Sequence, residues 1–362
     1  MERRSESGWI GLIGLLVSTA ATGCFGQASD PVPDWPQDEG PPLDEVLVDP
    51  ETVEAVYDGS EVPSDEELGL GQSALTISQG LVGEDAHLVG PLRDGLRLAN
   101  QMMRPGLLIL HDIARNHPAS EVSKDRVVWE VRRFQALHTL IIERDVQDAG
   151  QWNYALLVKP ALVSEARARL LLSGFFKPRA KVDGRQTGSG LLRYEYDTFR
   201  ALPGYGVQAR GVGAVGFKVT PEGREFNIVL ERFQGRADAS PISARYHYVL
   251  RGDGSGRFGF VLKTDIFPQS EGRETLTEAA AWNPSRAGKA RAHLTVLGLP
   301  DGLSIDECWD GQGKQLWVQW DPAIEGEESD GDEGDCEGPL AELELELDDL
   351  SAEPGEDPPI PD

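Results

Sequence analysis

Apolar and polar residues alternate from about residue 126 to residue 320, in about twelve short segments rich in β-branched and aromatic side chains. This period of two is typical of β-strands that bury one face. Clusters of Gly, Pro, Asp and Asn separate the segments, so we expect antiparallel pairing through tight turns. The segments are RVVWEVRRFQ, LHTLIIERDV, WNYALLVKP, ARARLLLSGFFK, GLLRYEYDTF, VGFKV, EFNIVLERF, ARYHYVL, GRFGFVLKTDIF, ETLTEAAAW, KARAHLTVLG and QLWVQWD.

The residues before the strands have a helical pattern instead. Apolar residues recur every three or four positions at Leu92, Leu96, Ala99 and Met103. Pro105 is expected to end or kink this helix, and residues 107–114 predict a second helix that ends before Pro118. The sequence therefore predicts a mainly β (α+β) fold: a large antiparallel sheet curled into a barrel or half-barrel, with two N-terminal helices packed against it.

The start of the chain has the layout of an export signal. Arg3 and Arg4 precede an apolar run at residues 9–17, and small residues then lead to Cys24. The run is shorter than the roughly 20 residues that a spanning helix needs. The stop at Cys24 resembles the lipobox of bacterial lipoproteins, in which the cysteine is diacylated. We expect residues 1–23 to be a signal peptide and Cys24 to carry the lipid, with an ordinary cleaved signal or a retained anchor as alternatives.

The charge is unevenly distributed. Residues 25–67 hold 14 acidic side chains, residues 321–362 hold 18, and neither segment has a Lys or Arg. Residues 68–320 hold 27 acidic and 32 basic side chains, a net charge of +5. We therefore expect a disordered acidic, Pro-rich tether at 24–66, a helical lead-in at 67–120, an antiparallel β domain at 121–320 and an acidic C-terminal tail at 321–362. The acidic tails argue against binding of nucleic acid.

Within the C-terminal tail, the segment PLAELELELDDL leaves two readings open. Leu340, Leu343, Leu347 and Leu350 fall at helical spacing, whereas Leu343, Leu345 and Leu347 alternate as in a strand. Leu and Glu are good helix formers, which slightly favours a short helix.

Two cysteines remain once Cys24 is set aside. In an exported chain, Cys308 and Cys336 predict one disulfide, which would hold the acidic segment against the last strand; two free thiols are the alternative. Asp330, Asp332 and Asp335 are weak candidates for a loose calcium site, but their spacing does not fit an EF-hand loop. A solvated run of charges is the simpler reading, and we expect no metal.

No motif indicates catalysis or cofactor binding. Residues 211–216 match GxGxxG, but a strand follows them where a dinucleotide site needs a helix, so a Gly-rich strand is expected. None of the six histidines has the spacing of a metal site or catalytic triad, and no GxSxG, HExxH or P-loop sequence occurs. We therefore expect no cofactor and no enzyme activity, although paired carboxylates can assemble in space without a sequence motif.

The C-terminal half of the domain carries a family resemblance. The segment WNPSRAGKAR at residues 282–291, followed by GLPDG at 298–302 and ECWD at 307–310, resembles uncharacterised β-rich lipoproteins of myxobacteria-like bacteria. The helical lead and the segment YALLVKP are similar in order, so the resemblance spans roughly residues 88–320. It implies no activity.

These patterns leave three hypotheses for function. The first is a structural or interaction lipoprotein, exported and anchored by its lipid to a membrane at the outer membrane or the periplasmic face of the envelope, with an unknown protein partner. The second is a tethered carrier of a hydrophobic ligand such as lipid, because a curled sheet with helices can enclose an apolar cavity. Its build is similar to that of periplasmic lipoprotein carriers with half-barrels and helical lids. The third is an envelope hydrolase.

Overall fold

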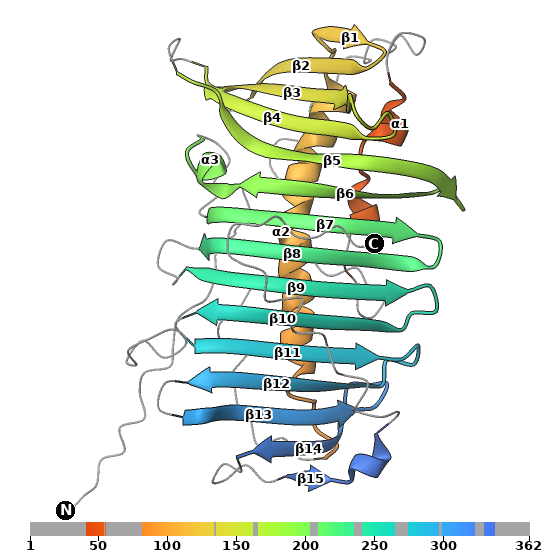
Figure 1. Cartoon of the computed structure of the whole chain (residues 1–362), viewed down its shortest axis with the longest axis vertical. Coiled ribbons are helices and arrows are strands. Elements are labelled where there is room, and N and C mark those ends of the chain that lie inside the picture. Colours follow the sequence, from red (N-terminus) through yellow and green to blue (C-terminus); the bar gives the residue numbers. More distant parts are fainter. Residues whose placement is uncertain are drawn as a thin grey trace, which may run out of the picture.

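A computed structural model describes residues 41–53, 55, 82–133, 135–161, 166–202, 209–234, 241–264, 274–296, 299–322 and 329–336. Its main element is one 15-stranded sheet, in which the strands follow one another in chain order (Figure 1). The strands are β1 (Glu121–Ser123), β2 (Arg126–Arg133), β3 (Ala136–Arg144), β4 (Trp152–Pro160), β5 (Arg169–Val182), β6 (Arg185–Glu195), β7 (Arg210–Thr220), β8 (Gly223–Gln234), β9 (Ile242–Arg251), β10 (Gly256–Thr264), β11 (Glu274–Trp282), β12 (Gly288–Val296), β13 (Leu299–Trp309), β14 (Gln315–Asp321) and β15 (Asp330–Gly331).

Every neighbouring pair in this sheet is antiparallel, as the tight turns predicted. Strands β1 and β15 are its two ends and do not pair with each other, so within the described part of the chain the sheet is open. The mainly β fold with one large antiparallel sheet is thus confirmed. An open sheet is compatible with the half-barrel alternative and excludes the closed barrel.

Helix α2 (Val89–Asn116) crosses the strands along one face of the sheet (Figure 1). The prediction of two separate helices is wrong, because this single helix of 28 residues passes through Pro105. Buried apolar residues lie on both sides of the proline, namely Leu92, Leu96, Leu107, Leu110 and Ile113. Each contributes about 1.5–3 kcal/mol by leaving water, whereas a proline inside a helix costs about 3 kcal/mol. The free energy gained by packing both halves of α2 on one sheet therefore exceeds the cost of a proline inside the helix.

A second correction concerns the expected tether. Helix α1 (Leu43–Val46) and the 3-10 turn η1 (Pro50–Val53) lie within it and contact β5, β6, β7 and α2. Val46, Val48 and Val53 are at most 2% exposed. The composition of segment 24–66 as a whole is acidic, and the prediction from it missed a short cluster of apolar residues. Residues 41–53 and 55 thus belong to the core, and the rest of segment 24–66 lies outside the described residues.

Buried polar side chains hold this segment in place. The side-chain amide of Gln186 in β6 donates to the carbonyl oxygens of Glu45 and Leu47 at 3.2 and 2.7 Å, and its oxygen accepts from the Asp49 N–H at 2.9 Å. The Asn100 side chain of α2 both donates to and accepts from the Ala55 backbone at 2.7 Å. These contacts satisfy backbone groups that no strand pairs.

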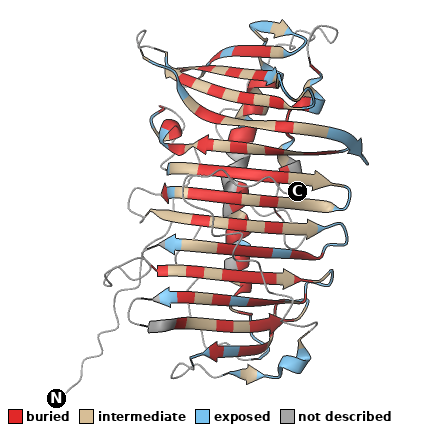
Figure 2. Cartoon of the chain, in the orientation of Figure 1, coloured by how far each residue is buried: buried red, intermediate tan, exposed pale blue. Residues whose placement is uncertain are grey.

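Buried and partly buried residues alternate along the strands, as Figure 2 shows by the red and tan bands. We call the buried side, which faces α2, the inner face. It is rich in aromatic rings, among them Trp129, Phe176, Phe217, Phe226, Tyr248, Phe258 and Trp309. The rings of Phe226 and Tyr248 stack with their centroids 5.4 Å apart. Cross-strand pairs of this kind stabilise the sheet beyond the burial of area alone.

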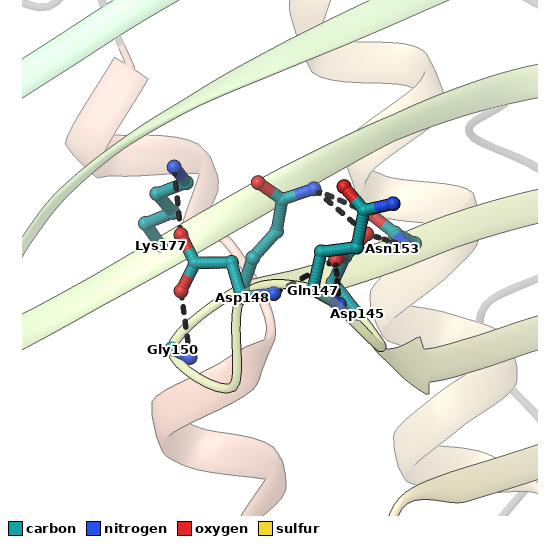
Figure 3. A network of polar contacts seen from close by, with 7 residues as sticks. Asp145, Gln147, Asp148, Gly150, Asn153 and Lys177 are labelled. Carbon is teal, nitrogen blue, oxygen red and sulfur yellow. Dashed lines mark hydrogen bonds and ion pairs between the residues drawn. The ribbon is translucent and has the colours of Figure 1, made fainter.

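Turn chemistry matches the sequence at three places. Residues 211–216 lie in β7, and a turn and another strand follow them, so the GxGxxG match is a Gly-rich strand. Residues 252–255 connect β9 to β10, where the Asp253 carboxylate accepts from the Ser255 N–H at 2.8 Å. Residues 145–150 connect β3 to β4 through the polar network of Figure 3.

Candidate functional site

The first candidate is a pair of glutamates on the inner face, at the start of α2. Glu307 of β13 is fully buried and accepts from the Leu88 N–H at 2.6 Å and the His87 N–H at 2.9 Å. The His87 ring nitrogen Nδ1 lies 3.2 Å from the same carboxylate. These N–H groups precede the helix and have no partner within it, and the helix dipole favours a negative charge here. Glu307 therefore caps α2.

Glu278 of β11 lies on the same face and is 1% exposed. Within the described residues, its Oε1 has no hydrogen-bond partner. Burial, and then the nearby charge of Glu307, raise the pKa of Glu278 well above its ordinary value of 4.5. The pair thus combines a hydrogen-bonded cap with an acid whose burial favours its protonated form. Neither carboxyl is exposed to solvent.

The sequence analysis missed this pair, although a signal existed. In the segment ETLTEAAAW, Glu278 stands two residues after Leu276 and two before Ala280, at the parity of the buried positions. Alternation alone therefore places a carboxyl on the inner face. Its proximity to Glu307 depends on the register of β11, β12 and β13, which is not readable from one segment.

The second candidate is the opposite side of the sheet over β7–β12, which we call the outer basic face. Among the regularly paired residues of these six strands, the outward positions hold seven Lys or Arg and two Glu. The basic residues are Lys218, Arg245, Arg251, Arg257, Lys263, Lys289 and Arg291, and the acidic ones are Glu225 and Glu231. Arg251, Arg257, Lys263 and Arg291 are exposed, whereas Lys289 is 6% exposed.

Contacts on this face engage charged groups of both signs. His247 Nε2 lies 3.0 Å from the Glu225 carboxylate, and Arg291 makes a bidentate pair with Asp306 of β13 at 2.6 and 2.7 Å. The guanidinium pKa of Arg291 rises because of this hydrogen-bonded pairing with Asp306. The face nevertheless keeps an excess of positive charge, which suits binding of an acidic partner.

The predicted disulfide is confirmed. Cys308 and Cys336 are bonded, with 5.8 Å between their Cα atoms. Cys308 points away from α2, because its neighbours Glu307 and Trp309 are the inward residues of β13. The bridge therefore fixes Cys336 on the outer side of the sheet. Cys24, the predicted lipid-bearing residue, lies outside the described residues.

Two of the three weak metal candidates accept hydrogen bonds from backbone N–H groups. Asp330 accepts from the Val82 N–H at 3.0 Å, and Asp332 accepts from the Gly334 N–H at 2.8 Å at the start of η3 (Glu333–Asp335). Asp335 is exposed within η3. Among the described residues, no group of three or more His, Cys, Asp or Glu is arranged to hold a metal ion.

The histidines are dispersed over the fold. Burial lowers the pKa of His138 on β3 to about 4. His111 on α2 contacts the Val48 carbonyl at 2.8 Å, and burial lowers the pKa of its ring. His293 contacts the Ser304 hydroxyl at 2.9 Å. The rings of His111 and His293 thus contact local groups of the fold.

The acids at the β3–β4 turn also serve local structure. Asp145 accepts from the Gln147 and Asp148 N–H groups at 2.8 and 2.9 Å and from the Asn153 amide at 3.0 Å (Figure 3). Asp148 pairs with Lys177 of β5 at 2.9 Å. These donors lower the pKa of both carboxyls, with the Asn153 and Lys177 hydrogen bonds as the largest causes. The network orders the turn.

A small polar hollow lies where β7 and β8 meet α3 (Tyr196–Arg200). Its volume is about 300 Å³, and its lining includes Asp197, Arg210, Glu231 and Arg232. Two acids against two arginines largely balance in charge, so the hollow favours neither an anion nor a cation.

Comparisons with protein-family models, with curated proteins and with solved structures found no match to this chain. Among the described residues, no helix has the length and apolar character needed to cross a membrane.

Proposed function

We propose that this chain is a cell-envelope lipoprotein, anchored through Cys24, that works as an interaction protein. It binds an acidic partner protein on the outer basic face of β7–β12. Catalysis is not part of the proposal.

The observation that carries this proposal is the contrast between the two sides of one sheet. The inner face is covered by α2 and by residues 41–53, and its aromatic rings are packed there. The outer side of β7–β12 carries seven Lys or Arg and two Glu. Electrostatic complementarity of this kind steers encounter and selects the partner more than it adds affinity.

A defined acidic probe tests the binding face. Residues 25–362 are prepared with the acids after Cys336 changed to Gln or Asn, so that the chain's own acids do not compete. A fluorescein-labelled peptide of glutamates should bind, and its affinity should fall at least tenfold between low and high salt, as exposed charge pairs are screened. Fluorescence anisotropy gives the Kd.

The triple variant Arg245→Glu, Arg257→Glu, Lys263→Glu should weaken binding at least tenfold. A matched pair, Lys124→Glu with Arg132→Glu at the β2 end of the sheet, should change it less than twofold. Equal losses in both variants, or no binding by the parent chain, would exclude the outer basic face as the binding site.

The lipid anchor needs its own measurement. Wild type should partition into detergent and show an acyl mass on its N-terminal peptide, whereas Cys24→Ala should fractionate as soluble or remain unprocessed. A wild-type peptide without an acyl mass contradicts the anchor.

One observation favours carriage of a hydrophobic ligand as the second candidate. Helix α2 lies against an inner face lined with aromatic rings, so its displacement would uncover a broad apolar surface. Native mass spectrometry of the domain from the periplasm separates the two candidates. A co-purified lipid supports carriage, and a clean apo mass supports the interaction protein.

A further inference from the structure

The C-terminal acidic segment begins on the outer side of the sheet, beside the outer basic face. Cys336 is the last described residue, and its disulfide holds it to Cys308 of β13. Cys308 pairs across the strands with Lys289 of β12, which is an outward residue of the outer basic face. The disulfide thus sets both the place and the side from which residues 337–362 continue.

The charge of that segment complements the surface beside it. Residues 337–362 contain ten Asp or Glu and no Lys or Arg. The outward positions of β7–β12 carry seven Lys or Arg and two Glu. Lys289, next to the point of attachment, is only 6% exposed, whereas Arg257 and Lys263 farther along the face are exposed.

The segment is long enough to cover the face. From β12 to β7 there are five strand spacings of about 4.8 Å, or about 24 Å. A segment of 26 residues reaches about 86 Å when fully extended and about 39 Å as a continuous helix, so it can cross the face in either conformation. A segment tethered at this distance meets the face at an effective concentration of about millimolar, which exceeds that of most free competitors.

We propose that residues 337–362 bind in cis to the outer basic face of β7–β12, with the Cys308–Cys336 disulfide fixing where they start. The segment then acts as an internal competitor, and an acidic partner must displace it to bind. This regulatory reading rests on the proposed function, whereas the docking itself is a property of the chain alone and is measured without a partner.

Carbodiimide coupling of the full chain tests the docking, because it joins a carboxyl to a lysine amine with loss of water only where the two touch. Mass spectrometry should find residues 337–362 joined to Lys218 and Lys263 at least tenfold more often than to Lys124, the exposed lysine between β1 and β2. High salt should reduce the coupling severalfold. The products should be monomeric and independent of protein concentration.

Two variants locate the contact. Arg245→Glu with Arg257→Glu leaves the reporter lysines in place and should lower the coupling at least fivefold, while Arg132→Glu on β2 should leave it unchanged. Should the reversed pair fail to fold, Arg245→Gln with Arg257→Gln provides the same comparison. Cys308→Ser with Cys336→Ser should lower the coupling severalfold, because the segment loses its fixed starting point.

Each other outcome overturns the docking. Coupling to Lys124 at the level of Lys263, or coupling that ignores both salt and the Arg variants, shows a segment without a preferred site. Cross-linked dimers at the expense of monomers show that the tail of a second copy binds instead. The wild-type chain could also show no coupling while its neutral-tail form binds the glutamate peptide. That result would overturn the docking and leave the proposed function intact.

Discussion

At the scale of single residues, two glutamates on the inner face differ in their hydrogen-bond donors. Glu307 is fully buried and accepts hydrogen bonds from the two N–H groups that precede α2. The Glu278 Oε1 has no hydrogen-bond partner among the described residues, and burial and the nearby charge of Glu307 raise the pKa of this carboxyl. The same residue type thus meets different polar groups at two positions of one face.

The raised pKa of Glu278 gives a stability prediction. The folded state holds this proton more tightly than the unfolded state, so the stabilisation is complete below the unfolded pKa near 4.5 and is lost as pH rises towards the folded pKa. Glu278→Gln keeps the neutral shape and removes the titration. Its free energy of unfolding relative to wild type should therefore increase from pH 5 to pH 8, by up to about 1.4 kcal/mol per pH unit.

Urea unfolding across that range measures the difference. Glu130→Gln, at an exposed position of β2, is the control and should follow the wild-type profile. A Glu278→Gln profile parallel to wild type would mean that Glu278 is ionised in the folded protein.

At the scale of elements, α2 approaches the sheet closely at two glycines. A Cβ atom on Gly95 would lie 2.6 Å from the Phe258 ring, and one on Gly106 would overlap the ring of Tyr194. Close contact along both halves of the helix explains how it continues through Pro105. The helix is therefore fixed by what it packs on rather than by its own propensity.

Alanine substitutions at two glycines of α2 separate packing from propensity. Gly106→Ala should destabilise by about 1–3 kcal/mol, because Tyr194 must move out of a packed position. Gly90→Ala, with nothing within 4 Å of the new Cβ, should stabilise by about 0.5–1 kcal/mol through helix propensity. Thermal unfolding measures both, and equal signs would show that α2 does not lie as closely on β6 as described.

Local sequence patterns predicted most of the fold but little of the candidate site. Alternation predicted the antiparallel strands, and the Asp-rich and Gly-rich turns between them were readable because their chemistry is local. Pro105 led to the wrong prediction of two helices. A rule based on one residue does not include the free energy gained by burying Leu107 and Ile113 after the proline. The Glu278–Glu307 pair and the outer basic face depend on register across several strands, so neither was predicted.

At the scale of the whole molecule, the core includes a segment that precedes the sheet by many residues. Val46 and Val53 are buried, and the Tyr154 hydroxyl of β4 donates to the Val46 carbonyl. Residues 41–53 and 55 thus cover part of the inner face beside α2. The β-strands and α2 alone do not cover this part. The folded unit therefore includes residues 41–53 and 55, which precede the predicted lead-in at 67.

Truncation tests this boundary. A chain that starts at residue 41 should melt within about 1 °C of one that starts at residue 25, since the residues removed are rich in Pro and acids. A chain that starts at residue 56 loses Val46, Val48 and Val53 and leaves Gln186 and Asn100 without their partners. Its melting temperature should fall by several degrees, because about 2 kcal/mol or more of burial is lost. If the chains that start at residues 41 and 56 have the same melting temperature, residues 41–55 belong to the tether and not to the folded unit.

The strand order has a consequence for how the chain acquires its structure. Each strand from β2 to β14 pairs only with the strands before and after it in the sequence. Contacts between sequence neighbours keep the loops that must close short, which favours fast folding even in an all-β sheet. A chain that emerges from a membrane pore with its N-terminus first can therefore add one hairpin at a time onto α2, which has already arrived. During such vectorial folding the sheet grows at one edge only, that of the most recently added strand. No strand has to remain unpaired until a strand distant in the sequence has formed.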